Sequence, residues 1–164
     1  MNKPKIEKMI LLSGAKGDEL PKAIKLLQAI SGKKPSITRA KKRIPVFGTR
    51  PGLEIGCIVT LRGNEVIPLL KKLLEAKEKK IPKKSIVTNN FSFGIAEYIE
   101  IPGVEYQRDI GIRGLQVTVV FSRSGRRVLF KKIKRGRLPA KQRVTPEEIR
   151  EYIEKNLNVE VLEK

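Results

Sequence analysis

The sequence predicts an α+β fold: an antiparallel β-sheet with helices packed on one face, and with an opposite face and a long hairpin that are polar and basic. Two patterns support this prediction. Several short runs alternate apolar and polar side chains, as do strands that bury one face. Other runs repeat apolar residues every three or four positions, as do helices that pack along one side. A sheet with helices on a single face follows from the two patterns together.

The strands are predicted from this alternation. In the run 54–62, Ile55, Cys57, Val59 and Leu61 point to one side and the intervening residues point to the other. Cys57 suits the buried side, because a free cysteine behaves as a small apolar side chain. Further strands are expected over 6–12, 36–44, 90–101 and 115–122.

Two helices are predicted from apolar periodicity and from their end signals. One spans 18–31 and is followed by Gly32, a residue type that ends helices. The other runs from Asn64, its N-cap, to about Lys80. The side chains expected to face the core are Leu20, Ala23, Ile24, Leu26, Leu27 and Ile30 in the first helix, and Val66, Ile67, Leu70, Leu73 and Leu74 in the second.

A third helix is predicted after the basic loop 131–143. Thr145 is its N-cap, Pro146 is its first residue, and Glu148 completes a capping box. No Pro/Gly/Ser-rich linker divides the chain, so we expect one domain over residues 1–164 that ends in this basic loop and helix, about 131–164. The apolar stripe of the helix is Ile149, Tyr152, Ile153 and Leu157.

The net positive charge of the chain comes from two stretches. The first basic stretch, residues 20–53, carries nine Lys/Arg and no Asp/Glu, and the second basic stretch, residues 110–146, carries eleven and none. The rest of the chain holds 16 basic and 17 acidic residues and is therefore neutral. Such segregation is typical of a surface that meets a polyanion, and nucleic acid is the expected partner. The alternative is a basic surface that is only solvated.

The composition argues against catalysis and against a metal site. The chain has no histidine, and its acidic residues recur at helical spacing beside lysines, as on a solvated helix face. A single cysteine excludes an internal disulfide and the usual zinc ligand sets. No apolar run is long enough to cross a bilayer, and no signal sequence is evident. We expect a cytoplasmic protein without enzyme activity, cofactor or membrane contact.

One aromatic residue, Phe47, lies close to the positive charge in the segment 38–56. Cationic side chains there surround Phe47, and an exposed ring among cations is typical of RNA recognition, where it stacks on an unpaired base. The alternative is that Phe47 packs against the base of the hairpin. Phe91 and Phe93 share a face of their strand, and core packing is expected for both. Their spacing is similar to that of RNA-recognition motifs, but the basic-Gly-aromatic lead-in of that motif is missing.

Several long motifs resemble the ribosomal protein L-five family of the large subunit. They are GKKPSITRAKKRI, FGTRPGLEIG and VTLRG within 32–63, and NFSFGIAEYIEIPGVEY and DIGIRG within 90–114. The resemblance runs in order through nearly the whole chain. The strand at the start, without a long leading helix, and the basic C-terminal extension are similar to the archaeal branch.

This resemblance implies a ribosomal protein that binds 5S ribosomal RNA in the central protuberance. The hairpin would approach the elbow of the transfer RNA in the peptidyl site, and other expected partners are large-subunit ribosomal RNA and neighbouring ribosomal proteins. Off the ribosome we expect a monomer. The predicted ribosomal RNA contacts are Lys33, Lys34, Thr38, Arg39, Lys41, Lys42, Thr60, Arg62, Lys131, Lys132, Lys134, Arg135 and Arg137, and the predicted transfer RNA contacts are Arg43, Phe47, Gly48, Thr49 and Arg50.

The chain departs from the family pattern at two positions. Leu12 stands where the family usually has asparagine, and Lys33 stands where glutamine is common. Both changes affect local hydrogen bonds to RNA, and Lys33 can replace one of them with a phosphate contact. The alternative function from the residues alone is a free RNA chaperone or RNA-binding regulator that uses the same basic surface outside the ribosome.

Overall fold

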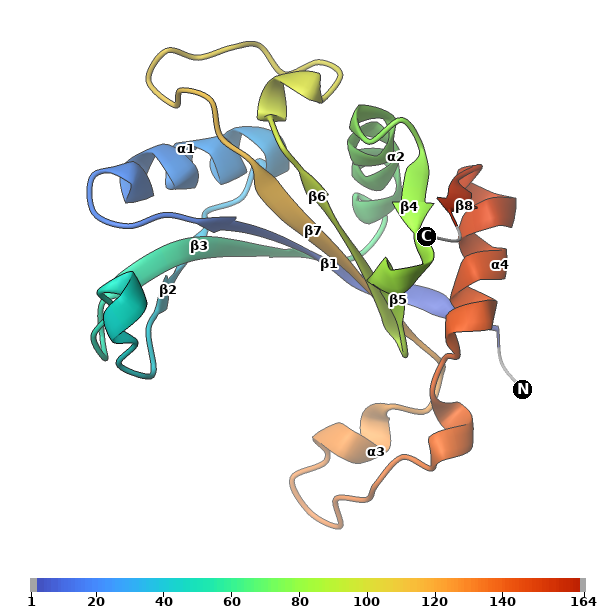
Figure 1. Cartoon of the computed structure of the whole chain (residues 1–164). Helices are drawn as coiled ribbons and strands as arrows, with labels where there is room; N and C mark the ends of the chain where they lie inside the picture. The colour runs from blue at the N-terminus through green and yellow to red at the C-terminus, as the bar shows by residue number, and fades with distance from the viewer. Residues whose placement is uncertain (1–2, 163–164) are drawn as a thin grey trace. The chain divides into compact units, whose positions relative to one another are not determined.

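The structure, a computed structural model, describes residues 3–162 and contains an antiparallel six-stranded sheet (Figure 1). The strand order in this sheet is β2-β3-β1-β7-β6-β5, and a separate two-stranded sheet pairs β4 with β8. The α+β prediction is therefore confirmed. The strands are β1 (Lys5–Gly14), β2 (Ser36–Arg39), β3 (Glu54–Leu61), β4 (Lys80–Pro82), β5 (Ile86–Val87), β6 (Asn90–Ile95), β7 (Leu115–Ser122) and β8 (Glu160–Leu162). The helices are α1 (Glu19–Ser31), α2 (Val66–Ala76), α3 (Arg127–Phe130) and α4 (Pro146–Leu157), with short 3-10 turns at Pro45–Phe47, Lys83–Ser85, Tyr98–Glu100 and Ala140–Gln142.

The chain divides into two compact units, which are described separately. The hairpin unit comprises residues 10–61 and 94–117, and the terminal unit comprises residues 1–9, 62–93 and 118–164. Strands β1, β6 and β7 each contribute residues to both units.

In the hairpin unit, α1 packs against β3 (Figure 1). The alternation predicted for β3 is present: Cys57, Val59 and Leu61 are buried, whereas Thr60 is exposed. Ile55 differs from the prediction, because it is 38% exposed near the start of the strand. The helix buries Leu20, Ala23, Leu26 and Leu27 and ends as predicted at Gly32, whose left-handed conformation lets its N–H donate to the Gln28 carbonyl at 2.8 Å.

In the terminal unit, α4 begins as the sequence predicts. The Glu148 N–H donates to the Thr145 hydroxyl at 3.4 Å, and the Thr145 N–H donates to the Glu148 carboxylate at 3.1 Å, which completes the capping box. The helix lies beside β8, which pairs in parallel with β4 (Figure 1). The ring of Tyr152 meets the buried ring of Phe121 edge-on, with ring centroids 5.2 Å apart.

The second helix is shorter than predicted. Its N-cap is Glu65 instead of Asn64, and it ends at Ala76 because the residues after Lys77 leave the helical conformation. Glu78 and Lys79 have φ values of 54° and 57°, and the Lys79 N–H turns back to the Leu74 carbonyl at 2.9 Å. The expected core residue Ile67 is 45% exposed, so the helix buries a narrower stripe than its periodicity indicates.

Two strands are also shorter than predicted, and three short strands were not expected. The strand predicted over 36–44 ends at Arg39, where the pairing with β3 shifts at a bulge after Thr38. The strand predicted over 90–101 ends at Ile95. Phe91 and Phe93 are buried as predicted. The unexpected strands are β4, β5 and β8, each of two or three residues.

Candidate nucleic-acid interface

The hairpin between β2 and β3 carries most residues predicted to meet RNA. Its paired part is short: Ser36 lies opposite Ile58, and Thr38 lies opposite Gly56. Because Cys57 and Val59 are buried, the alternation places Thr38, Gly56 and Thr60 on the side of these strands opposite α1. The predicted contacts Thr38 and Thr60 therefore share one face, and Thr60 is exposed there.

The strands lie too close together at Gly56 to admit a side chain there. An alanine Cβ at position 56 would lie 2.7 Å from the Ser13 carbonyl oxygen and 3.3 Å from the Thr38 hydroxyl oxygen, so only glycine fits without displacement. Leu12 of β1 alternates with the buried residues Leu11 and Ser13 and is 36% exposed, on the side away from the core. Leu12 therefore places an apolar side chain on the helix-free side.

The connection from β2 to β3 is an ordered loop. The Ile44 and Thr49 backbones exchange two hydrogen bonds of 3.2 Å, and the 3-10 turn between them ends at Gly48 with a φ of 58°. The ammonium group of Lys16 donates to the carbonyl oxygens of Phe47 and Gly48 at 3.4 and 3.3 Å. Lys16 therefore links the tip of the loop to the segment that follows β1.

The tip exposes its apolar side chains. Phe47 is 70% exposed and Val46 is 88% exposed. The alternative in which Phe47 packs against the hairpin base does not hold in this structure. Such exposure leaves the ring available to stack on a base or a sugar.

The cations of the loop are directed to solvent. Lys41, Lys42, Arg43 and Arg50 are exposed, and none of them forms an ion pair with a residue in the range 3–162. Arg39 differs, because its guanidinium contacts the Glu54 carboxylate at 3.1 Å. Both side chains of that pair are accessible to solvent, 66% and 39% exposed, so the pair contributes little stability and a phosphate can compete for Arg39. Lys33 and Lys34, between α1 and β2, are exposed as well.

Arg62 and the predicted contacts beyond residue 130 belong to the terminal unit. Arg62 is exposed directly after β3. The loop after α3 carries the exposed predicted contacts Lys131, Lys132, Lys134, Arg135 and Arg137.

Three arginines of the second basic stretch form ion pairs that stabilise the fold. Arg123, whose side chain is 8% exposed, donates from one guanidinium NH₂ group to both carboxylate oxygens of Glu148, with one contact of 2.6 Å. This bond lowers the pKa of the Glu148 carboxyl. Arg126 pairs with Glu7 and lies over the ring of Phe130 at 5.7 Å.

Arg113 has the same role in the hairpin unit. Its guanidinium contacts the Glu19 carboxylate at 3.1 Å and donates to the Gly14 carbonyl at 3.2 Å. Burial raises the pKa of the Cys57 thiol, and the positive charge of Arg113 partly opposes that shift. The count of basic residues in this stretch therefore exceeds the number that can reach a ligand.

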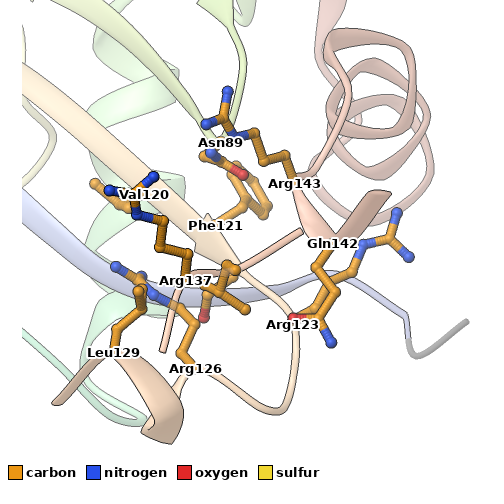
Figure 2. A pocket seen from close by; sticks show the side chains of 11 residues that line it. Asn89, Val120, Phe121, Arg123, Arg126, Leu129, Arg137, Gln142 and Arg143 are labelled. Atoms are coloured by element: carbon orange, nitrogen blue, oxygen red, sulfur yellow. The ribbon is translucent and has the colours of Figure 1, made fainter. Parts of the chain in front are cut away.

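The terminal unit also contains a cavity that the sequence did not reveal (Figure 2). It has a volume of about 390 Å³ and lies where the end of β7 meets the loop after α3. Its lining residues come from four separate segments, so no local motif predicts it. Four of them are arginines, Arg123, Arg126, Arg137 and Arg143, and only Arg137 was among the predicted contacts.

Two negative findings concern the described part of the chain. Between residues 3 and 162, no helix combines the length and apolar character needed to span a membrane. Within the same range, no three His, Cys, Asp or Glu side chains gather in a way that would hold a metal ion.

Comparison with known proteins gives a consistent result over the whole chain. A family model described as ribosomal protein L5 matches residues 1–50, and the model of the C-terminal part of that family matches residues 54–150. A Nanoarchaeum equitans protein named large ribosomal subunit protein uL5 is 41% identical over 99% of this chain and 98% of its own length. Proteins of the same name from Archaeoglobus fulgidus and Sulfolobus acidocaldarius are 42% and 40% identical, over 86% and 92% of this chain and 79% and 85% of their own lengths. The chain belongs to the ribosomal protein L5 family, and its relatives place it with the archaeal members.

Proposed function

We propose that this protein is a structural constituent of the large ribosomal subunit that binds 5S ribosomal RNA in the central protuberance. The observation that carries the proposal is the match to relatives named as large-subunit proteins over nearly the full length of both chains. It acts by binding and not by catalysis, without a cofactor, as one domain in the cytoplasm. It is a monomer before assembly, and its further partners are large-subunit ribosomal RNA and neighbouring ribosomal proteins.

The proposed 5S surface is the helix-free side of β2 and β3 with the adjacent cations. Thr38 and Thr60 share that side, and their hydroxyl groups can donate to phosphate or ribose oxygens. Exposed lysines at 41 and 42 supply the charge that holds an RNA backbone. In the terminal unit, Arg62 and the cations between 131 and 137 have the same role toward ribosomal RNA.

The proposed transfer RNA contact is the tip of the hairpin, from Arg43 to Arg50. Phe47 is exposed there, between cations and next to the left-handed turn at Gly48. An aromatic ring supported by positive charge can stack on unpaired or terminal bases and on the edge of a ribose. We therefore assign Arg43, Phe47, Gly48, Thr49 and Arg50 to the elbow of the transfer RNA in the peptidyl site.

Sedimentation of a cell extract tests whether the protein is a ribosomal constituent. A constituent of the large subunit travels with that subunit in a gradient, in a fixed ratio to its RNA. Recovery of the protein only in the light fractions would refute the proposal and favour a free RNA chaperone or RNA-binding regulator.

Binding to purified RNA tests the 5S assignment. The protein is titrated with 5S ribosomal RNA and with an unrelated structured RNA of equal length, at several salt concentrations. We expect a preference for 5S RNA of about a hundredfold, or about 2.7 kcal/mol, that persists as the salt concentration rises. Equal affinities that fall together with salt would mean that the basic stretches attract RNA without selecting it.

A further inference from the structure

The cavity of the terminal unit combines features that separate it from an ordinary basic surface. Four arginines surround it, and none of its eleven lining residues is acidic. Arg123 and Arg126 are already paired with carboxylates outside the cavity, those of Glu148 and Glu7. Arg137 and Arg143 are exposed and form no ion pair with any residue between 3 and 162.

The floor of the cavity is apolar. Val120 of β7, Leu129 of α3 and Leu138 of the following loop line it, and each is partly exposed. A site for a simple anion needs donors only, so this apolar floor indicates a ligand that also has an apolar surface. The volume of about 390 Å³ lies at the lower end of the range for small-molecule sites, roughly 300–1,000 Å³.

Two amide side chains also line the cavity, together with Phe121 and Ser122. The Asn89 carbonyl oxygen accepts from the Val144 N–H at 2.8 Å, which orients that amide and leaves its NH₂ group as a donor. Gln142 forms no side-chain hydrogen bond within residues 3–162, so its amide can both donate and accept. Figure 2 shows Arg126, Leu129 and Arg137 on one side of the cavity and Arg123 and Gln142 on the other.

We propose that this cavity binds a single unpaired nucleotide of ribosomal RNA, with its phosphate on Arg137 and Arg143 and its base over the apolar floor. The proposal rests on the RNA-binding function proposed above and adds a specific site to it. Arginine recognises phosphate through paired N–H donors, and its flat face also stacks on a base. The amide of Gln142 is available for the hydrogen-bonding edge of that base.

An unpaired nucleotide can use the arginines, the amides and the apolar side chains of the lining together. A phosphate alone leaves the apolar floor and the amides unused. An acidic peptide would use the arginines but would place further carboxylates over Val120, Leu129 and Leu138, where they lose hydration without a donor. A base fills that space with a flat, largely apolar surface.

The test is a titration of the ¹⁵N-labelled full chain, followed by amide chemical shifts. The ligands are the four nucleoside 5′-monophosphates, ribose 5-phosphate, inorganic phosphate and an oligoglutamate peptide. We expect at least one nucleotide to bind about tenfold more tightly than inorganic phosphate, with the largest shifts at Ser122, Leu138 and Gln142. Equal binding of all phosphates, shifts spread along the basic loop, or a preference for oligoglutamate would overturn the proposal.

Matched double variants separate the cavity from the general charge of the loop. Arg137→Gln with Arg143→Gln removes the two available arginines, and Lys131→Gln with Lys132→Gln removes the same charge outside the cavity. We expect nucleotide affinity to fall about tenfold or more in the arginine variant and little in the lysine variant. Equal losses of nucleotide affinity in both variants would show that only the general charge of the loop attracts nucleotides, and would refute the proposal. All four residues are exposed, so both proteins should fold, which melting curves verify.

The two proposals fail in different ways. If the protein sediments with the large subunit and selects 5S RNA but the nucleotide titration is negative, only the cavity assignment is wrong. If nucleotides bind in the cavity but the protein does not join the large subunit, the cavity assignment stands and the ribosomal function is wrong.

Discussion

The charge of the hairpin loop leads to a quantitative prediction about RNA binding. Lys41 and Lys42 are adjacent, exposed and without an ion-pair partner among residues 3–162, so each is available to one phosphate. We consider the double change Lys41→Ala with Lys42→Ala. Because neither side chain is buried, the change should leave the melting temperature nearly unaltered, and the effect should appear in RNA affinity.

The size of the effect follows from the release of counterions. Each phosphate contact contributes about 0.9 to the slope of log K against log salt concentration on a duplex, so the loss of two contacts lowers that slope by about 1.8. Between about 50 and 200 mM salt, the ratio of the variant Kd to the wild-type Kd should therefore shrink about tenfold. The slope should change by the same amount on 5S RNA and on an unrelated duplex, because phosphate contacts carry no sequence information.

Filter binding or fluorescence anisotropy at four or more salt concentrations measures this slope. The matched control is Lys71→Ala with Lys72→Ala, which removes the same charge from the exposed side of α2, outside both basic stretches. The control should keep the wild-type slope. An unchanged slope in the hairpin variant, or an equal change in the control, would refute the assignment of phosphate contacts to this loop.

Three further predictions concern the tip, the helix cap and a close contact between strands. Phe47→Ala should weaken transfer RNA contact by roughly 1–3 kcal/mol in a binding assay while 5S affinity and melting temperature stay the same, since the ring is 70% exposed; a lower melting temperature would assign the ring to the core. Glu148→Gln should destabilise the fold by about 2 kcal/mol at neutral pH, because Arg123 loses its carboxylate. The pKa of Glu148 is lowered in the folded state from its ordinary value of 4.5, so this stabilisation is fully present above that pH and is lost as the pH falls through the lowered pKa; melting curves of the two proteins should converge in acid. Gly56→Ala should cost about 1–3 kcal/mol in chemical denaturation, because its Cβ would lie 2.7 Å from a carbonyl oxygen, whereas Gly94→Ala, which meets nothing within 4 Å, should cost clearly less.

The sequence predicts best the elements whose signals are local. The start of α4 depends on Thr145, Pro146 and Glu148, three residues within one turn, and all three behave as predicted. The end of α1 depends on Gly32 alone, and the left-handed conformation is found there. The end of α2 has no such signal, because the left-handed residues after it are Glu78 and Lys79, which rarely adopt this conformation. The apolar periodicity alone therefore predicted a helix that continues past its actual end at Ala76.

Features that depend on distant segments were not predictable. The parallel pairing of β4 with β8 joins three-residue segments about 80 positions apart, and neither segment is long enough to show alternation. The bulge that ends β2 depends on the register with β3. The exposure of Phe47 also depends on how the loop folds, so the sequence alone is compatible with both an exposed and a packed ring, although it shows the basic character of the surroundings.

Some basic residues form ion pairs within the protein, so fewer cations are available to RNA phosphates than the net charge of +19 indicates. Of the eleven cations in the second basic stretch, Arg113, Arg123 and Arg126 contact carboxylates that come from outside the stretch. The other eight form no ion pair within residues 3–162. If each of them met one phosphate, this stretch would contribute at most about 7 to the salt slope, compared with about 10 from a simple charge count. Arg113 ties the residues before β7 to α1, Arg123 ties the residues after β7 to α4, and Arg126 ties the start of α3 to β1. Replacing these three should lower stability first and RNA affinity only as a consequence, whereas replacing the other eight should lower affinity alone.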